Sequence, residues 1–160
     1  MADFPLPTYS FLDVYGTIAG PGLSADFGSG SGQVSFGNGY GQADEGITFE
    51  PLEDKNRMTP GASGEVMHTL VGVDAANVAI HVLKTSPLNA KLNAAYNYQK
   101  QSSLYWGQNT ITVTNPVSGD HYTCSQVAFT HRPPNAFSKE TVPVVWEFMV
   151  GHLYVVLGSA

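Results

Sequence analysis

The chain has 160 residues, of which 42% are hydrophobic and 12% are charged, and this composition predicts one globular domain, residues 1–160, with a substantial core. The formal charge of −6 argues against a surface that neutralises phosphates, and so against a nucleic-acid-binding protein. The single cysteine excludes an internal disulfide, and no signal peptide or membrane anchor is expected, because no basic segment with a following apolar run and no long apolar stretch occurs.

The first third of the chain predicts short strands and tight turns. Residues 9–18, YSFLDVYGTI, place aromatic and β-branched side chains on both alternating faces, which is typical of a strand covered on both sides. Ten of the 17 glycines lie between Gly16 and Gly46, and Asn38-Gly39 predicts a type I′ turn. We therefore expect an irregular connection followed by short strands.

The glycine-rich stretch 28–46, GSGSGQVSFGNGYGQADEG, does not match a phosphate-binding loop. Neither of its clusters has the third glycine of a dinucleotide fingerprint or leads into a helix, and the Gly-Lys-Ser/Thr of a Walker loop is absent from the sequence. Its glycines are predicted to shape turns and bulges, and we expect no cofactor.

Residues 46–72 predict two strands joined by a long protruding loop. Strand-like alternation at the start of the segment gives way to polar residues around Pro60 and Gly64 before apolar residues return. We expect a loop or arm at about 44–69. Residues 44–57 hold five of the 13 acidic side chains and then Lys55 and Arg57, a composition that suits either a solvated hairpin tip or an arm that docks on a neighbouring copy.

The second half of the chain predicts a helix between strands. The alternation of NVAIHVLK, residues 77–84, indicates a strand. Ser86 can cap a helix whose first position is Pro87, and this helix is expected at about 87–101. Residues 109–114 and 121–129 predict a hairpin, with a β-bulge near Ser125-Gln126 where the apolar parity shifts.

The C-terminal run VPVVWEFMVGHLYVVLG changes phase at Gly151-His152, which predicts one long bent strand or two strands. In total the sequence predicts a mainly β protein with about seven strands and one flanking helix. A β-sandwich or a barrel with the helix packed against it is the expected architecture.

No pattern of catalytic or metal-binding residues is found. The five histidines form no His-x-x-x-His pair and have no cysteine companions at zinc spacing, and a Gly-x-Ser-x-Gly elbow is absent. Cys124 has His121 and His131 nearby in sequence, but this spacing alone does not make a nucleophile and a base. We expect no catalytic residue and no metal site, and thus no enzyme.

Several segments together resemble the tail tube proteins of contractile-tailed bacteriophages, which are related to type VI secretion tube proteins. The resemblance covers roughly Phe11 to Gly158, and it rests on GITFEPLEDKNRMTPGASGEVMHTL, VLKTSPLNAKLNAAYN, SSLYWGQNTITVTNP and GDHYTC, within which EDKNRMT, KTSP and WGQNTITV are the most specific parts. Such a family implies a structural virion protein with a β-sandwich-like or barrel-like fold and a flanking helix.

The resemblance also implies an assembly. Tube proteins of this kind form homohexameric rings that stack into a hollow tube, in which strands of six subunits join into a continuous β-barrel. The implied partners are further copies of the chain, the tail sheath protein, and the baseplate and tail terminator proteins, while double-stranded DNA passes through the lumen without specific binding. The implied location is the phage tail of the virion, assembled in the host cytoplasm.

The same comparison suggests which residues lie between subunits. The arm is the segment that would reach adjacent subunits or rings, and Trp106 suits either another interface or the core. The candidate contact residues are therefore Glu53, Asp54, Lys55, Asn56, Arg57, Met58 and Trp106.

Three other readings remain open at this point. The tube of a tailocin or of a type VI-like contractile injection system shares the fold and the sequence features. A monomeric carbohydrate- or ligand-binding β-sandwich is compatible with the eight tyrosines and two tryptophans. An enzyme that uses convergent histidines is the third.

Overall fold

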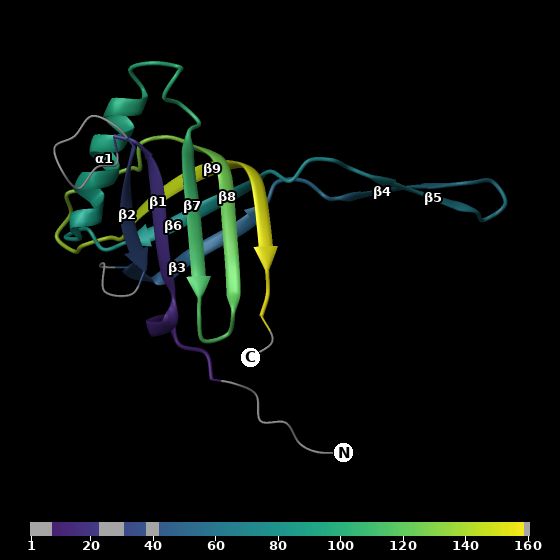
Figure 1. The fold of residues 1–160 in the computed structure, drawn as a ribbon, viewed down its shortest axis with the longest axis horizontal. Helices are drawn as coiled ribbons and strands as arrows, with labels where there is room; N and C mark the ends of the chain where they lie inside the picture. Colours follow the sequence, from purple (N-terminus) through teal and green to yellow (C-terminus); the bar gives the residue numbers. More distant parts are fainter. Residues whose placement is uncertain (1–7, 23–30, 38–41, 159–160) are drawn as a thin grey trace.

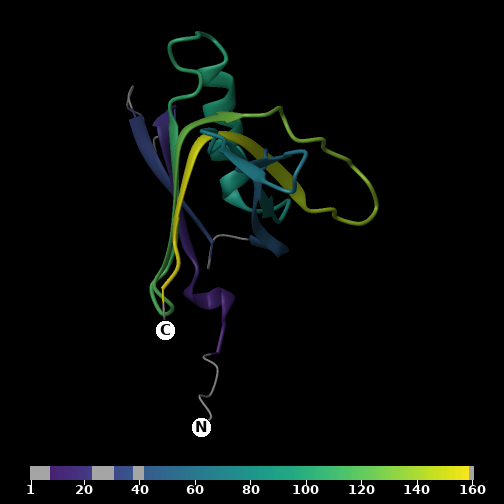
Figure 2. The ribbon, with the colours of Figure 1, turned by 90° about the vertical axis from the view of Figure 1, so that its right-hand side faces the viewer.

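The computed structural model describes residues 8–22, 31–37 and 42–158. Its body is one antiparallel sheet of seven strands, which curls into a half-barrel (Figures 1 and 2). In spatial order the strands are β2 (Ser31–Gly37), β1 (Tyr15–Pro21), β7 (Asn109–Asn115), β8 (Asp120–Phe129), β9 (Val144–Val156), β6 (Ala76–Val82) and β3 (Gln42–Pro51). The expected mainly β fold is confirmed, and of the two architectures expected the barrel-like one applies.

Two further elements flank the sheet. The helix α1 (Pro87–Gln99) packs on one side of the body, and strands β4 (Asn56–Pro60) and β5 (Val66–Leu70) form a separate hairpin that projects away from it on the other side (Figure 1). None of the helices in the described part of the chain has the length and apolar character needed to cross a membrane.

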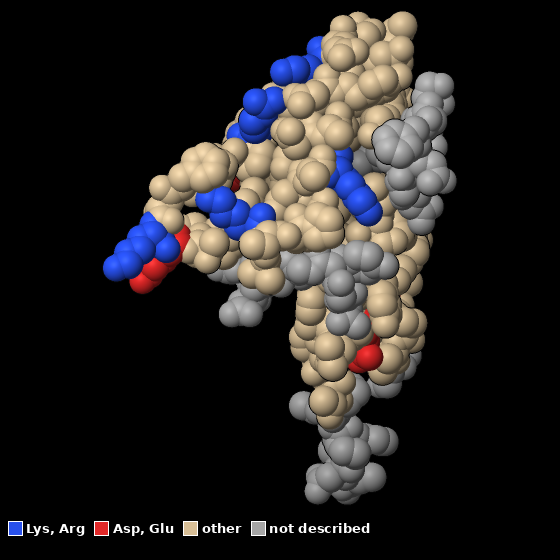
Figure 3. Space-filling view, turned by 90° about the vertical axis from the view of Figure 1, so that its left-hand side faces the viewer, with Lys and Arg blue, Asp and Glu red and all other residues tan. Residues whose placement is uncertain are grey.

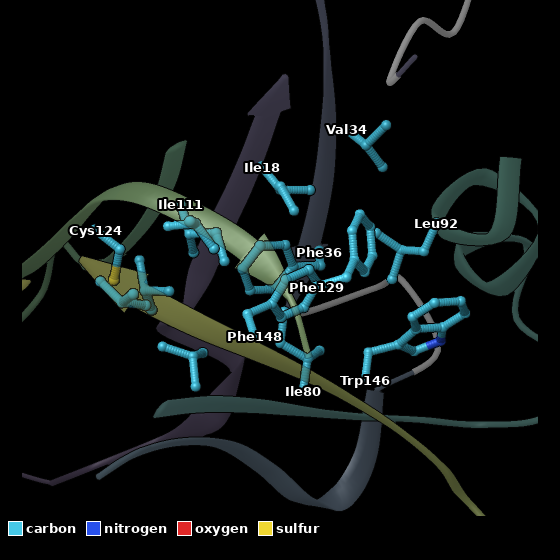
Figure 4. Packing of buried hydrophobic residues seen from close by; sticks show 14 of the residues in the cluster. Ile18, Val34, Phe36, Ile80, Leu92, Ile111, Cys124, Phe129, Trp146 and Phe148 are labelled. Atoms are coloured by element: carbon cyan, nitrogen blue, oxygen red, sulfur yellow. The ribbon is translucent and has the colours of Figure 1, made fainter. Parts of the chain in front are cut away.

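The core lies between the sheet and α1. In β6 every second residue is buried, from Ala76 to Val82, because alternate side chains of a strand point to the same face. Leu88, Leu92 and Ala95 supply the buried face of α1. Figure 4 shows the aromatic centre of this core, in which the ring of Phe129 lies 4.8 Å from that of Phe148.

The predicted helix start is confirmed. The hydroxyl of Ser86 accepts a hydrogen bond from the amide of Leu88 at 3.2 Å, and Pro87 occupies the first turn, where its missing N–H has no helical partner to lose. The helix ends at Gln99, whose amide exchanges hydrogen bonds with the buried side chain of Asn109 at 2.7 and 2.9 Å. This amide pair joins the end of α1 to β7.

The predicted bulge in the 109–129 hairpin is also confirmed. Ile111 pairs with Cys124 but Asn109 pairs with Val127, so β8 has one residue more than β7 across this interval. Gln126 accommodates it with a φ of 53°. Gly151 lies in β9, on the other side of β8, and a Cβ atom at this position would lie only 3.0 Å from the Cβ of Gln126. This close approach accounts for the glycine at the phase change of β9. The structure has one long strand there.

The expected strand at 9–18 is wrong in its first half. Phe11–Asp13 form a short 3-10 helix, and the strand begins at Tyr15. The physical reason is local, because the hydroxyl of Ser10 accepts the amide of Leu12 at 3.1 Å and so stabilises a turn in place of an extended chain.

The glycine-rich segment lies only partly within the described residues. The expected Asn38-Gly39 turn falls outside them. Gly37 and Gly46 have φ values of 102° and 67°, which L side chains rarely adopt, and both therefore serve the backbone role that the sequence predicts.

Candidate assembly surface

The projecting hairpin and its two connections, residues 52–75, form a segment that we call the arm. Every residue from Pro51 to Leu70 is exposed, so no part of the hairpin packs on the body of its own subunit. An isolated two-stranded hairpin is only marginally stable in water. The arm therefore offers an exposed surface that its own subunit does not cover. Of the arm expected at 44–69, residues up to Pro51 belong to strand β3, which pairs with β6.

The root of the arm is fixed by a small set of polar contacts. The ammonium of Lys55 lies 2.6 Å from the carboxylate of Asp74 and donates to the carbonyl of Val71 at 3.0 Å. The amide of Val71 in turn donates to the carbonyl of Lys55 at 2.8 Å. Lys55 lowers the pKa of the Asp74 carboxyl, chiefly through their hydrogen bond, so this carboxyl stays charged at neutral pH.

The return strand of the arm is also tied to the body. The amide of Leu52 donates to the carbonyl of Ala75, and the amide of Leu153 in β9 donates to the carbonyl of Asp74, both at 3.1 Å. These bonds hold the two strands of the root together and against the sheet. The direction in which the hairpin leaves the body is thus set by the fold.

The hairpin has two chemically different faces. Directly opposite residues of an antiparallel pair share a face, and successive residues alternate between faces. One face, which we call the apolar face, carries Met58, Pro60, Val66 and Leu70, together with Asn56 and His68, whose side chains share a hydrogen bond of 3.1 Å. The other face carries Arg57, Thr59, Met67 and Thr69.

The apolar face has no core beneath it. Leu70 is 83% exposed, Met58 59% and Val66 49%. Single exposed apolar side chains are common on protein surfaces. A row of them on one face of a projecting hairpin is instead typical of a protein-protein contact. Of these residues only Met58 was among the sequence candidates. The order of apolar and polar residues in 66–70, VMHTL, does not alternate, so the sequence held no clear signal for Val66 and Leu70.

The structure separates the sequence candidates into two groups. Glu53, Asp54, Lys55, Asn56, Arg57 and Met58 all lie on the arm and are exposed. Trp106 lies elsewhere, in the connection between α1 and β7, where it is 36% exposed and its ring meets Tyr96 edge-on at 6.0 Å. Within the first group, Lys55 and Asn56 bond within the arm, whereas in the part of the chain that the structure describes Glu53, Asp54 and Arg57 form no ion pair.

The sheet has two open edges. β2 and β3 are its outermost strands, and within the described ranges neither carries another strand on its outer side. The far end of β9 is open in a different way, because Tyr154, Val156 and Leu157 are exposed where the strand extends past the core. Open strand edges and exposed apolar strand ends are features that other chains can cover.

The chemistry of the remaining polar residues is structural. Among the residues 8–22, 31–37 and 42–158, no three His, Cys, Asp or Glu side chains gather closely enough to hold a metal ion. His81 bonds to the carbonyl of Gly46 at 3.0 Å, and His131 lies 3.1 Å from the carboxylate of Glu147. Cys124 is fully buried, and burial raises its pKa to about 12, so its thiol is not a nucleophile at neutral pH.

Comparison with known proteins gives one family match. The sequence model of the family described as "Bacteriophage PhiTE tail tube protein" matches residues 6–158. No curated protein matches the chain.

Solved structures of contractile injection systems share the fold. The sheath/tube terminator of the extracellular contractile injection system PVC, in the extended state, is 11% identical with a TM-score of 0.53, over 98% of this chain and 99% of that chain. The tube-terminating cap of the anti-feeding prophage is 16% identical with a TM-score of 0.51, over 99% and 95%. A chain of the PVC sheath-tube complex is 12% identical with a TM-score of 0.51, over 97% and 93%.

Proposed function

The chain belongs to the bacteriophage PhiTE tail tube protein family, whose members are structural tube proteins and not enzymes, and we propose that it forms the tail tube as stacked homohexameric rings through which double-stranded DNA is ejected. The observation that carries this proposal is the arm. A hairpin with an exposed apolar face, held at a set angle by its root, is suited to contact a neighbouring copy.

The open sheet edges support the ring. In a ring of six subunits the outer edge of β2 of one copy and the outer edge of β3 of the next can be brought together, so that six curled sheets continue into one barrel around a lumen. Closure of the barrel satisfies the backbone groups that the single subunit leaves open. A protein built for a monomeric role would blunt or cover such edges.

The charge of the chain suits a conduit for DNA. The chain has a formal net charge of −6 and few cationic side chains that could neutralise phosphates. A lumen lined by its sheet would therefore let DNA pass without binding it. Each contact between copies can be modest, because repetition around the ring and along the stack makes the whole tube durable.

The proposed partners follow from this placement in a particle. Copies of the chain form the tube, the tail sheath protein surrounds it, and the baseplate and tail terminator proteins close its ends. The solved structures that share the fold come from a sheath-tube complex, a sheath/tube terminator and a tube-terminating cap, which supports these partner classes. The proposed location is the phage virion, with assembly in the host cytoplasm.

A second candidate has an observation in its favour. Two of the structures that share the fold belong to an extracellular contractile injection system, so the chain is also suited to the tube of a tailocin or a type VI-like particle. The two functions differ in what the tube conducts. Particles purified from the source that contain a genome support the phage tail, whereas particles that never contain DNA support the injection system.

Negative-stain electron microscopy of the purified protein, with sedimentation of the same sample, tests the proposal. We expect rings or hollow tubes with six-fold end views. A species that stays monomeric over a hundredfold range of concentration would contradict the proposal and favour a ligand-binding β-sandwich, which a glycan screen by melting temperature would then examine.

A further inference from the structure

The charges of this acidic chain are divided between two regions. Residues 75–139 contain five of the seven Lys and Arg side chains but only one of the 13 Asp and Glu side chains. Residues 1–74 contain the other two Lys and Arg side chains and ten of the Asp and Glu side chains. The first of these regions includes α1 and the second includes the arm. Figure 3 shows Lys and Arg side chains along the side of the molecule that carries α1.

A pocket lies on this basic side, between α1, β9 and the segment that follows β8. Its volume is about 310 Å³. Among the described residues two cations, three carboxamides and three apolar side chains line it, and no carboxylate does: Lys84, Asn89, Asn93, Arg132, Pro133, Asn135, Val144 and Trp146. An apolar floor with a basic rim fits an acidic segment that carries one large apolar side chain.

The two cations at the rim have only neutral partners among the described residues. Arg132 donates to the amide oxygen of Asn97 at 2.6 Å, and its guanidinium lies 5.2 Å from the centre of the Tyr96 ring. Lys84 donates to the carbonyl of Ala136, and its ammonium lies 4.4 Å from the centre of the Phe137 ring. These contacts position both charges without neutralising them, and so leave them available for carboxylates.

Residues 50–54, at the junction of β3 and the arm, have the complementary composition, and we call them the acidic arm root. Glu50, Glu53 and Asp54 are exposed there, and Leu52 between them is 48% exposed. The nearby Lys55 does not offset these charges, because it pairs with Asp74. Residues 50–54 are thus an acidic segment in which Leu52 is the large apolar side chain, and this is the chemistry that the pocket fits.

The two surfaces cannot meet within one subunit. The arm leaves the body on the side opposite to α1 (Figure 1). Two complementary surfaces at opposite ends of one molecule form a heterologous contact, which generates rings when the rotation closes and filaments when it does not. Such a contact is therefore suited to the repeated assembly of identical subunits.

We propose that Leu52 of one subunit enters the pocket of a neighbouring copy, while Glu53 and Asp54 pair with Lys84 and Arg132 at its rim. The inference rests on the proposed tube function and adds to it the surface on which the arm root docks. The neighbouring pocket contributes partners for Glu53 and Asp54, which form no ion pair among the described residues of their own subunit.

A charge exchange tests this contact. Lys84→Glu with Arg132→Glu, and separately Glu53→Lys with Asp54→Arg, should each raise the protein concentration needed for tube formation by about tenfold or more, since each change turns attraction into repulsion. The chain with all four substitutions should assemble within about threefold of the unmodified protein, because the pairs are restored with exchanged signs. Sedimentation and electron microscopy measure assembly, and thermal melting of the dissociated chain checks folding.

The matched control is Lys91→Glu with Lys100→Glu, which changes the net charge equally on α1 and at its C-cap but outside the pocket. It should affect assembly much less. If the reversal at the rim lowers the melting temperature, Lys84→Gln with Arg132→Gln removes the charges without repulsion and should still weaken assembly.

The outcomes separate the two proposals. An unmodified chain that forms tubes, with both reversals assembling equally well or with no recovery in the fourfold variant, overturns the docking contact alone. Rim variants that form normal tubes but no longer bind the sheath protein also overturn it, because the pocket would then belong to the sheath contact. An unmodified chain that stays monomeric contradicts the tube function and the docking contact with it.

Discussion

Lys55 ties the root of the arm together through Asp74 and Val71, although it is not among the residues proposed to contact the neighbouring pocket. Its pair with Asp74 is about half exposed on both sides, so it contributes little to the stability of the fold. The pair joins the two strands at the root, and its loss should let the hairpin change direction. A residue that acts through geometry in this way can affect assembly strongly and folding weakly.

We therefore expect Lys55→Glu to impair tube formation while leaving the melting temperature of the subunit within about 2 °C, given the small worth of exposed ion pairs. Lys55→Glu combined with Asp74→Lys should recover much of the assembly, because the ion pair is re-formed in reverse. Sedimentation measures the assembly of each variant. Tubes that form normally from Lys55→Glu alone would show that the root pair has no part in positioning the arm.

Cys124 reports on the core of the sheet. Its side chain is fully buried and burial raises its pKa to about 12, from 9.0 for an exposed thiol. The raised value means that this group contributes stability below pH 9, and that the contribution falls between pH 9 and pH 12 as unfolding releases the proton.

At pH 8 the thiol should react with iodoacetamide only after unfolding. Mass spectrometry of the protein incubated with the reagent, with and without a denaturing concentration of urea, measures this. Rapid modification of the native chain would contradict the packing around β8.

At the scale of elements, the hairpin should be separable from the body. All residues of β4 and β5 are exposed, so their removal costs the body no buried contact. Across the root, the amide of Val71 donates a hydrogen bond of 2.8 Å to the carbonyl of Lys55. A two-residue Asn-Gly turn is the kind of connection that joins two residues paired in this way.

Replacement of residues 56–70 by Asn-Gly should leave the melting temperature of the subunit nearly unchanged and abolish tubes. Calorimetry and electron microscopy on the same preparation test both parts. A shortened chain that still forms tubes would show that the apolar face of the hairpin is not needed for assembly.

The attachment of α1 depends on a buried polar pair. Gln99 and Asn109 exchange two hydrogen bonds, and Gln99 also donates to the carbonyl of Pro21 at 2.8 Å. The backbone of β1 comes so close that a Cβ at Gly20 would overlap the amide oxygen of Asn109. The pair thus links α1, β1 and β7.

Asn109→Ala should lower the free energy of unfolding by about 1–3 kcal/mol, since it leaves the amide of Gln99 buried with a lost partner. Urea denaturation followed by circular dichroism measures the change. As a comparison, Asn93→Ala on the exposed side of α1 should have a small effect. Equal effects of the two substitutions would contradict the role of the amide pair.

At the scale of the whole molecule, local patterns in the sequence predicted the elements well where the determining interactions are themselves local. Ser86 and Pro87 revealed the helix start, and the parity shift near Gln126 revealed the bulge. The same reasoning failed at Phe11–Asp13, because a single hydroxyl contact at Ser10 outweighs the β propensity of its neighbours.

The proposed assembly surfaces were harder to predict from the sequence. The pair of Lys55 and Asp74 spans the whole hairpin, and the pocket combines residues from before α1, from α1, from the segment after β8 and from β9. No local spacing connects such positions. Trp106 as an inter-subunit residue stays a prediction, because a residue that is 36% exposed and whose ring contacts Tyr96 fits both a packing role and a contact.

A cryo-electron microscopy reconstruction of the assembled protein tests the central claim most directly. We expect hexameric rings in which the outer edges of β2 and β3 pair between subunits, the apolar face of each hairpin is covered by another copy, and Leu52 lies in the pocket beside Arg132. An assembly in which the hairpin projects into solvent and both sheet edges remain open would contradict the account.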